Sequence, residues 1–319
     1  MGTFALLTSI LTLTLRAGTS LIYATVGEIY TERSGILNLG VEGMMLSSAV
    51  AAFATAYYSG SAWLGLLAAM LMGGALAAVH AFLTVTMRAN QVVSGLSITL
   101  FGTGFASYLG ERLGPASNNY NLVGLVGPRF WAAEIPVLSE VPVLGAFFKQ
   151  DILTYFLFFM VPAAWYYLYR TRNGLNLRAV GESPQTADAM GINVARTRYA
   201  YTLLGGVLVG LGGAHLSLAY LGGWAENLTG GRGWIVIALV IFSMWNPARA
   251  VLGAVLFGGL SAVQFRLQAE GIVIPVAYLK MLPYLATVLI LVAMTWWEAL
   301  SHRIGAPAAL GEPYIREEK

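Results

Sequence analysis

Nine stretches of apolar residues, most of them long enough to cross a lipid bilayer, follow one another along the chain. A membrane-spanning helix needs about 20 mostly apolar residues. The pattern therefore predicts an all-α, polytopic membrane helix bundle of about eight to ten spans. The expected spans are Phe4–Ala24, Leu37–Tyr58, Trp63–Val85, Val92–Leu109, Ile152–Tyr169, Tyr199–Leu221, Trp234–Trp245, Val251–Leu267 and Tyr278–Trp297.

The seventh stretch is shorter than the others and directly follows a glycine-rich sequence, Gly230 to Gly233. Irregular backbone is tolerated at membrane depth only where it is buried in protein or lines a cavity. We therefore expect a broken or re-entrant helix here. Small residues at four-residue spacing in other spans predict surfaces of close helix packing. These are Gly102, Ala106 and Gly110, then Gly206 and Gly210, then Ala254, Gly258 and Ala262.

The composition agrees with a membrane protein, since 57% of the 319 residues are hydrophobic and only 10% are charged. Soluble domains usually carry about 25% charged residues. The chain has no cysteine, which excludes disulfides, thiolate metal sites and cysteine nucleophiles. Its three histidines are scattered, and the net charge of +3 is too small to indicate nucleic acid as a partner. We expect no metal, no cofactor and no catalytic residue.

Lysine and arginine predict the orientation, because cytoplasmic loops carry an excess of both. If the segment 170–198 is cytoplasmic, eleven of these residues fall on its side of the membrane and six on the other. The N-terminus is then external, and the C-terminus is internal after nine crossings. We expect one transmembrane domain, 1–300, with an external loop 111–150, a cytoplasmic loop 170–198 and a cytoplasmic tail 301–319.

A short helix is predicted inside the cytoplasmic loop. Ser183 is a good N-cap, Pro184 is a good first helical residue and Gly191 is a natural left-handed terminator. The helix would run from Pro184 to Met190 and stand alone between two spans. Two turns are too short to be stable in isolation, so it must dock on its own bundle or on a partner. A capped turn in a plain surface loop is the alternative.

Four stretches resemble one family of transport proteins. They are LRAVGESPQTADAMGINVARTRY at 177–199, ERSGILNLGVEGMM at 32–45, GGRGWIVIALVIFSMWNPARAVLGAVLFG at 230–258 and PVAYLKMLPYLATVLILV at 275–292. Together they resemble the permease subunits of ATP-binding-cassette (ABC) importers, in the branch that handles simple sugars and nucleosides. The form of the stretch 32–45 is most similar to short nucleoside permeases that work with lipoproteins of the basic-membrane-protein type.

The resemblance implies that the short helix is the coupling helix, which sits on a separate ATPase subunit. Its residues would be Glu182, Ser183, Pro184, Gln185, Thr186, Ala187, Asp188, Ala189, Met190 and Gly191. The chain lacks G-x-x-x-x-G-K-[ST], so ATP must bind to the partner, and we expect a transport subunit rather than an enzyme. The implied partners are ABC ATPase subunits, an identical or homologous second permease, an external substrate-binding protein and the lipid of the cell membrane.

Polar residues within the apolar stretches are candidates for lining the translocation path, because such groups are costly at membrane depth. Asn38 and Glu42 are four apart, so on a helix they would share one face. The full set of candidates is Asn38, Glu42, Gln91, Ser94, Thr99 and Trp234. Hydrogen bonding between helices is the competing interpretation for the polar members, and an interfacial aromatic for Trp234.

Neutral amides suit a nucleoside cargo, with simple sugars such as ribose as the nearest alternative. Branched-chain amino acids carry an ammonium and a carboxylate, for which a charged path would be expected. An ion-coupled secondary transporter would show carboxylates deep in several spans and recognisable inverted halves. A membrane-embedded enzyme would need clustered acid, base or metal-ligand residues, and the sequence shows no such cluster.

Overall fold

The computed structural model describes residues 3–269 and 305–316, together with positions 278, 281–282, 285–286, 288–289, 292 and 296. The described chain is almost entirely helical. Its long helices are α1 (Thr3–Arg33), α2 (Val41–Ser59), α3 (Ala62–Ala81), α4 (Gln91–Arg112), α5 (Ile152–Arg170), α8 (Val194–His215) and α10 (Pro247–Ala269). Shorter helices are α6 (Arg172–Glu182), α7 (Pro184–Ala189) and α9 (Arg232–Phe242).

The remaining elements are small. Two π-helical turns, Phe82–Thr86 and Leu216–Tyr220, continue α3 and α8. Between α4 and α5 lie three 3₁₀ turns (Ala116–Asn118, Leu138–Glu140 and Leu144–Phe148) and the strands β1 (Ala132–Glu134) and β2 (Lys149–Asp151). The strands pair antiparallel, with Ala133 opposite Gln150. The loop expected at 111–150 therefore has structure of its own.

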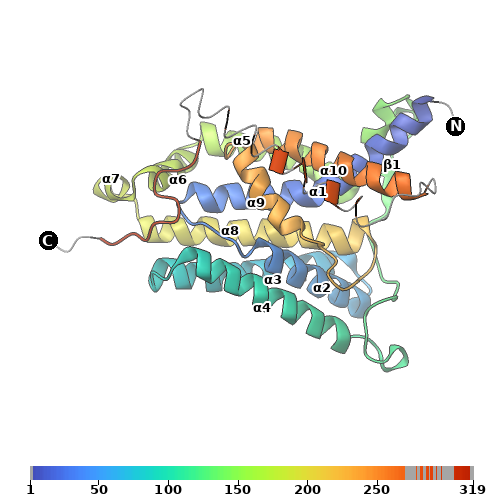
Figure 1. Ribbon diagram of the computed structural model, residues 1–319, viewed down its shortest axis with the longest axis horizontal. Helices are drawn as coiled ribbons and strands as arrows, with labels where there is room; N and C mark the ends of the chain where they lie inside the picture. Colours follow the sequence, from blue (N-terminus) through green and yellow to red (C-terminus); the bar gives the residue numbers. More distant parts are fainter. Residues whose placement is uncertain are drawn as a thin grey trace.

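The bundle is built around α1, α2 and α8. Helix α8 packs against α1, α2 and α3, and α2 fills the space between α3, α4 and α8. In Figure 1, α3 and α4 lie on one side of α1 and α8, α5 and α10 lie on the other, and α9 runs across α1. Helices α6 and α7 and the C-terminal tail lie at one end of the bundle, and the N-terminus and the α4–α5 connection lie at the opposite end. This matches the separation expected between the loops 170–198 and 111–150.

Six helices of the described chain are long and apolar enough to cross a membrane: those beginning at Leu7, Ala62, Gln91, Ile152, Val194 and Pro247. The second expected span is α2, which has 19 residues and is mostly buried in the bundle. The seventh is α9, which has only 11 residues and is therefore too short to span a bilayer by itself. The expected span Tyr278–Trp297 lies largely outside the described residues.

The three predicted small-residue surfaces are confirmed as sites of close packing. A methyl group added at Gly102 would lie 2.6 Å from the carbonyl oxygen of Gly43, so α4 and α2 touch through their backbones. One at Gly206 would lie 2.5 Å from the carbonyl oxygen of Gly73, which joins α8 to α3. Gly258 meets α1 at Thr14 in the same way. Backbone contact of this kind stabilises helix pairs where lipid removes the hydrophobic driving force.

Three expectations need correction. Helix α1 continues nine residues past the expected end at Ala24, to Arg33, and includes two further carboxylates. The second span begins at Val41 and not at Leu37, because residues 34–40 are not helical. The short cytoplasmic helix does not stand alone: α6 precedes it directly, and the two helices pack together.

Candidate functional site

Residues 34–40, between α1 and α2, form a non-helical segment within the bundle, and side chains from other helices bind its backbone. The N–H of Leu37 donates to Oε1 of Gln91 at 2.6 Å. Nε2 of His80 lies 3.1 Å from the carbonyl oxygen of Leu37, and Oγ1 of Thr99 donates to the carbonyl of Leu39 at 2.7 Å. Helices α3 and α4 thus supply the hydrogen bonds that a helix would make internally, which irregular backbone at membrane depth requires.

Asn38 lies inside this segment and stabilises it from within. Its Nδ2 donates to Oε2 of Glu28 at 3.1 Å, and its Oδ1 accepts from the N–H of Gly40 at 2.9 Å. The hydroxyl of Ser94 lies 2.9 Å from Nδ1 of His80. Both ring nitrogens of the buried His80 therefore have partners, so it is a packing residue of this region.

Glu42, in the first turn of α2, caps a different helix. Its Oε1 accepts from the hydroxyl of Thr229 at 2.5 Å and from the N–H of Gly231 at 2.9 Å. Its Oε2 accepts from the N–H of Gly233 at 2.5 Å. The first N–H groups of a helix have no partner within the helix and carry a partial positive charge. The carboxylate of Glu42 neutralises that charge at the start of α9.

We call segment 34–40, the first turn of α2 and residues 229–233 the polar junction. Asn38 and Glu42 both belong to it, but the interpretation that they share one helix face is wrong, because Asn38 precedes α2. Gln91 and Thr99 reach the junction from α4, and Ser94 is joined to it through His80, which binds Leu37. The structure thus brings five of the six candidates together, bonded within the chain. Trp234 differs: it follows the junction on α9 and is 42% exposed. A path-lining role for all six stays a prediction.

The sequence interpretation missed two buried acids of α1. Glu28 binds Asn38, and Oε2 of Glu32 accepts from Nε1 of Trp245 at 2.5 Å, beyond the end of α9. A pair of carboxylates four residues apart beside an apolar stretch was the available signal, because such groups usually face a bundle interior.

The short helix predicted within the loop 170–198 forms as expected. The hydroxyl of Ser183 accepts from the N–H of Thr186, Pro184 is the first residue of α7, and Gly191 has a left-handed φ of +85°. The buried face of α7 packs on its own chain, where Ala187 meets Val180 and Val194. The opposite face is open, and Met190 at its end is 79% exposed.

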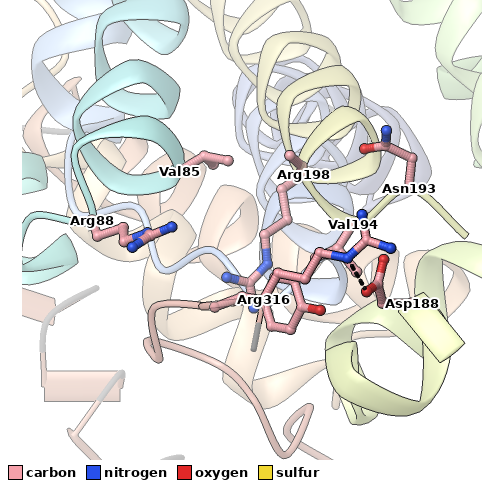
Figure 2. Close-up of a pocket in the computed structure, with 9 residues that line it drawn as sticks. Val85, Arg88, Asp188, Asn193, Val194, Arg198 and Arg316 are labelled. Atoms are coloured by element: carbon pink, nitrogen blue, oxygen red, sulfur yellow. Dashed lines mark ion pairs between the residues drawn. The ribbon is translucent and has the colours of Figure 1, made fainter. Parts of the chain in front are cut away.

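The C-terminal tail, residues 305–316, covers part of this region. Nε of Arg316 lies 3.1 Å from Oδ2 of Asp188 on α7. Figure 2 shows this ion pair at the rim of a cavity, with Arg198 reaching down from α8 and Arg88 on the far side. The cavity has a volume of about 260 Å³. Three arginines and one aspartate line it, so its charge is predominantly positive.

Comparison with known proteins agrees with this architecture. The model of the family described as branched-chain amino acid transport system / permease component matches residues 9–294. The chain belongs to this permease family. It is therefore a multi-pass protein of the cell membrane and the permease component of an ABC transporter, as the resemblance implied.

Curated relatives of this permease cover nearly its whole length. A protein of Haloferax volcanii, provisionally named glucose ABC transporter permease TsgC13, is 38% identical over 97% of this chain and 98% of its own. The nucleoside ABC transporter permease NupC of Lactococcus lactis is 38% identical over 94% of each chain. The guanosine ABC transporter permease NupQ of Bacillus subtilis is 32% identical over the full length of both.

Proposed function

We propose that this permease forms the translocation path of an ATP-driven importer whose cargo is a nucleoside. The observation that carries the choice of cargo is the position of Glu42. In transporters with broken helices, the free N-terminus of a half-helix binds an anionic group of the substrate. Here the protein's own carboxylate occupies the N-terminus of α9. The junction therefore offers no such site to the carboxylate of an amino acid, which favours an uncharged cargo.

Two of the relatives described above are named for nucleosides or guanosine, and this supports the nucleoside among uncharged cargoes. A simple sugar is the second candidate, because a relative of equal identity is named for glucose. Both cargoes would bind through hydroxyl and amide groups, so the chemistry of the junction suits either.

For energy coupling, we propose that the exposed face of α7 docks on a separate ATPase. A helix of six residues gains little stability by itself, and its Ala187 packs in a small cluster whose other buried members are Val180 and Val194. The open face carries Gln185, Thr186 and Met190, all exposed. Met is flexible and polarizable, and it adapts well to a partner's groove. The assembly would contain a second permease, two ATPases and a binding protein at the end that carries the α4–α5 connection.

The test is ATP hydrolysis and uptake by the reconstituted complex in proteoliposomes. This chain is co-purified with its ATPase, partner permease and binding protein, and guanosine, glucose or leucine is added in turn. We expect guanosine to stimulate hydrolysis and to accumulate inside the vesicles. Stimulation by glucose alone would move the cargo to sugars, and stimulation by leucine alone would contradict the argument from Glu42. A complex that hydrolyses ATP without accumulating any solute would contradict the importer proposal.

A further inference from the structure

The C-terminal tail lies against the bundle through backbone hydrogen bonds at one end. The N–H of Ala309 donates to the carbonyl of Gly181 in α6 at 2.9 Å. The N–H of Gly311 donates to the carbonyl of Gly35 at 3.2 Å. Gly35 belongs to the non-helical segment 34–40, so the tail is bonded directly to the polar junction.

Arg198 of α8 strengthens the same connection. Its side chain is only 1% exposed, although it lies at the end of the bundle. Its Nε donates to the carbonyl of Ser34 at 3.2 Å, and its Nη1 donates to the carbonyl of Glu312 at 3.1 Å. One guanidinium therefore joins the start of segment 34–40 to the tail. Bonds to a charged donor are about twice as strong as neutral ones.

At its other end the tail contacts α7 through side chains. Tyr314 packs against the small apolar cluster that holds Ala187 of α7. Arg316 pairs with Asp188 at 3.1 Å. Burial, and then a hydrogen bond and the charge of Asp188, raise the pKa of the Tyr314 hydroxyl. The Arg316 side chain is 79% exposed, and an exposed ion pair contributes only up to about 1 kcal/mol. Tyr314 must therefore supply much of the attachment.

We propose that residues 305–316 act as a strap that transmits movement of the coupling helix α7 to segment 34–40 and, through it, to Asn38 and Glu42. This inference rests on the proposed function, because it requires an ATPase that moves α7. The strap gives α7 a further route to the junction, beside those along α6 and α8, and bonds to Gly181 of α6 and to Arg198 of α8 hold it in place. Its two attachments differ: the junction end is held by buried backbone bonds, and the α7 end by side chains that substitution can remove.

The experiment uses the full-length chain in the reconstituted complex, with guanosine and glucose each supplied through the binding protein. The variant Tyr314→Ala/Arg316→Ala removes both attachments to α7 and leaves the backbone bonds at the junction in place. The quantity measured is the amount of solute accumulated per ATP hydrolysed. We expect this ratio to fall about fivefold, the lower end of typical coupling between sites. Assembly and ATP hydrolysis should stay within about twofold of the unmodified complex, because the ATPase-facing side of α7 is unchanged.

Two controls make the result specific. Ala308→Ser changes an exposed position in the middle of the strap and should leave the ratio unchanged. Asp188→Arg places two arginines together and should lower the ratio, whereas Asp188→Arg/Arg316→Asp restores an opposite pair and should recover it. If Asp188 acted only by contacting the ATPase, the swapped pair would not restore the ratio of uptake to ATP hydrolysed.

An unchanged ratio in Tyr314→Ala/Arg316→Ala would overturn the strap. So would loss of the ATPase on purification, since the tail would then be part of the docking surface itself. Failure of the proposed function looks different, because the unmodified complex would then accumulate neither solute. If the unmodified complex accumulates solute and the variant reaches the same ratio of uptake to ATP hydrolysed, the strap proposal fails and the proposed function stands.

Discussion

The two non-helical segments that meet at the polar junction are held in opposite ways. Segment 34–40 is largely buried, and side chains of α3, α4 and α8 bind its backbone at several points. Residues 222–231, which lead into α9, are less buried, with Glu226, Asn227 and Gly230 exposed, and they form part of the wall of a cavity of about 500 Å³. Thr229 and Gly231 at their end are bound by Glu42.

This difference separates a firmly held segment from a loosely held one. A segment whose polar groups are all bound to fixed helices opens only at a large cost in free energy, whereas exposed segments with few buried contacts open at low cost. We therefore expect substitutions around segment 34–40 to lower the stability of the bundle. Substitutions in 222–231 should instead alter transport while the fold persists. Glu42 connects the two segments, since it lies in the first turn of α2, directly after segment 34–40, and caps α9, directly after residues 222–231.

The largest effect is expected from Glu42→Ala. The hydroxyl of Thr229 and the N–H groups of Gly231 and Gly233 would all lose their acceptor. Hydrogen bonds to charged groups contribute about 1.5–3 kcal/mol each, so we expect the free energy of unfolding to fall by about 3 kcal/mol or more. Unfolding in mixed detergent micelles measures the change. Glu226→Ala removes an exposed carboxylate from the same region and should change stability little. Equal effects of the two variants would contradict the capping role of Glu42.

Gln91→Leu should have an intermediate effect, because it removes the acceptor of one buried backbone N–H, that of Leu37. Interhelical hydrogen bonds in membrane proteins average about 0.6 kcal/mol and reach about 1.7 kcal/mol, so we expect a loss of about 1 kcal/mol. The same unfolding measurement applies, with Ser97→Ala as the control, since Ser97 is an exposed residue of α4. A loss no larger than that of the control would show that segment 34–40 is not fastened as described.

Local signals in the sequence were sufficient for α7 and α9. Ser183, Pro184 and Gly191 specify the ends of a short helix within a few residues, and Gly230 to Gly233 interrupt an apolar stretch directly. Segment 34–40 has one such signal, Gly35 with a φ of +87° just past α1, but ILNL has the apolar pattern expected at the start of a span. Its conformation depends on Gln91 and Thr99, which bind it from 54 and 60 residues away. The backbone bonds of the tail likewise cannot be predicted from the sequence, since any residue except proline can donate them.

The smallest effect on stability, and the most direct test of the comparison, is expected from Asn227→Gly. Asn227 is exposed and has a φ of +51°, a left-handed conformation that glycine adopts without strain. The free energy of unfolding should therefore stay within about 0.5 kcal/mol of the unmodified protein. Uptake per ATP should nevertheless change, because Asn227 lines the cavity beside α9 and glycine removes its amide and loosens the backbone there. Asn90→Gly is the matched control, since Asn90 is an exposed helix cap far from this cavity and should cost a few tenths of a kcal/mol without altering uptake per ATP. A loss of stability comparable to that of Gln91→Leu would mean that residues 222–231 are held as firmly as segment 34–40.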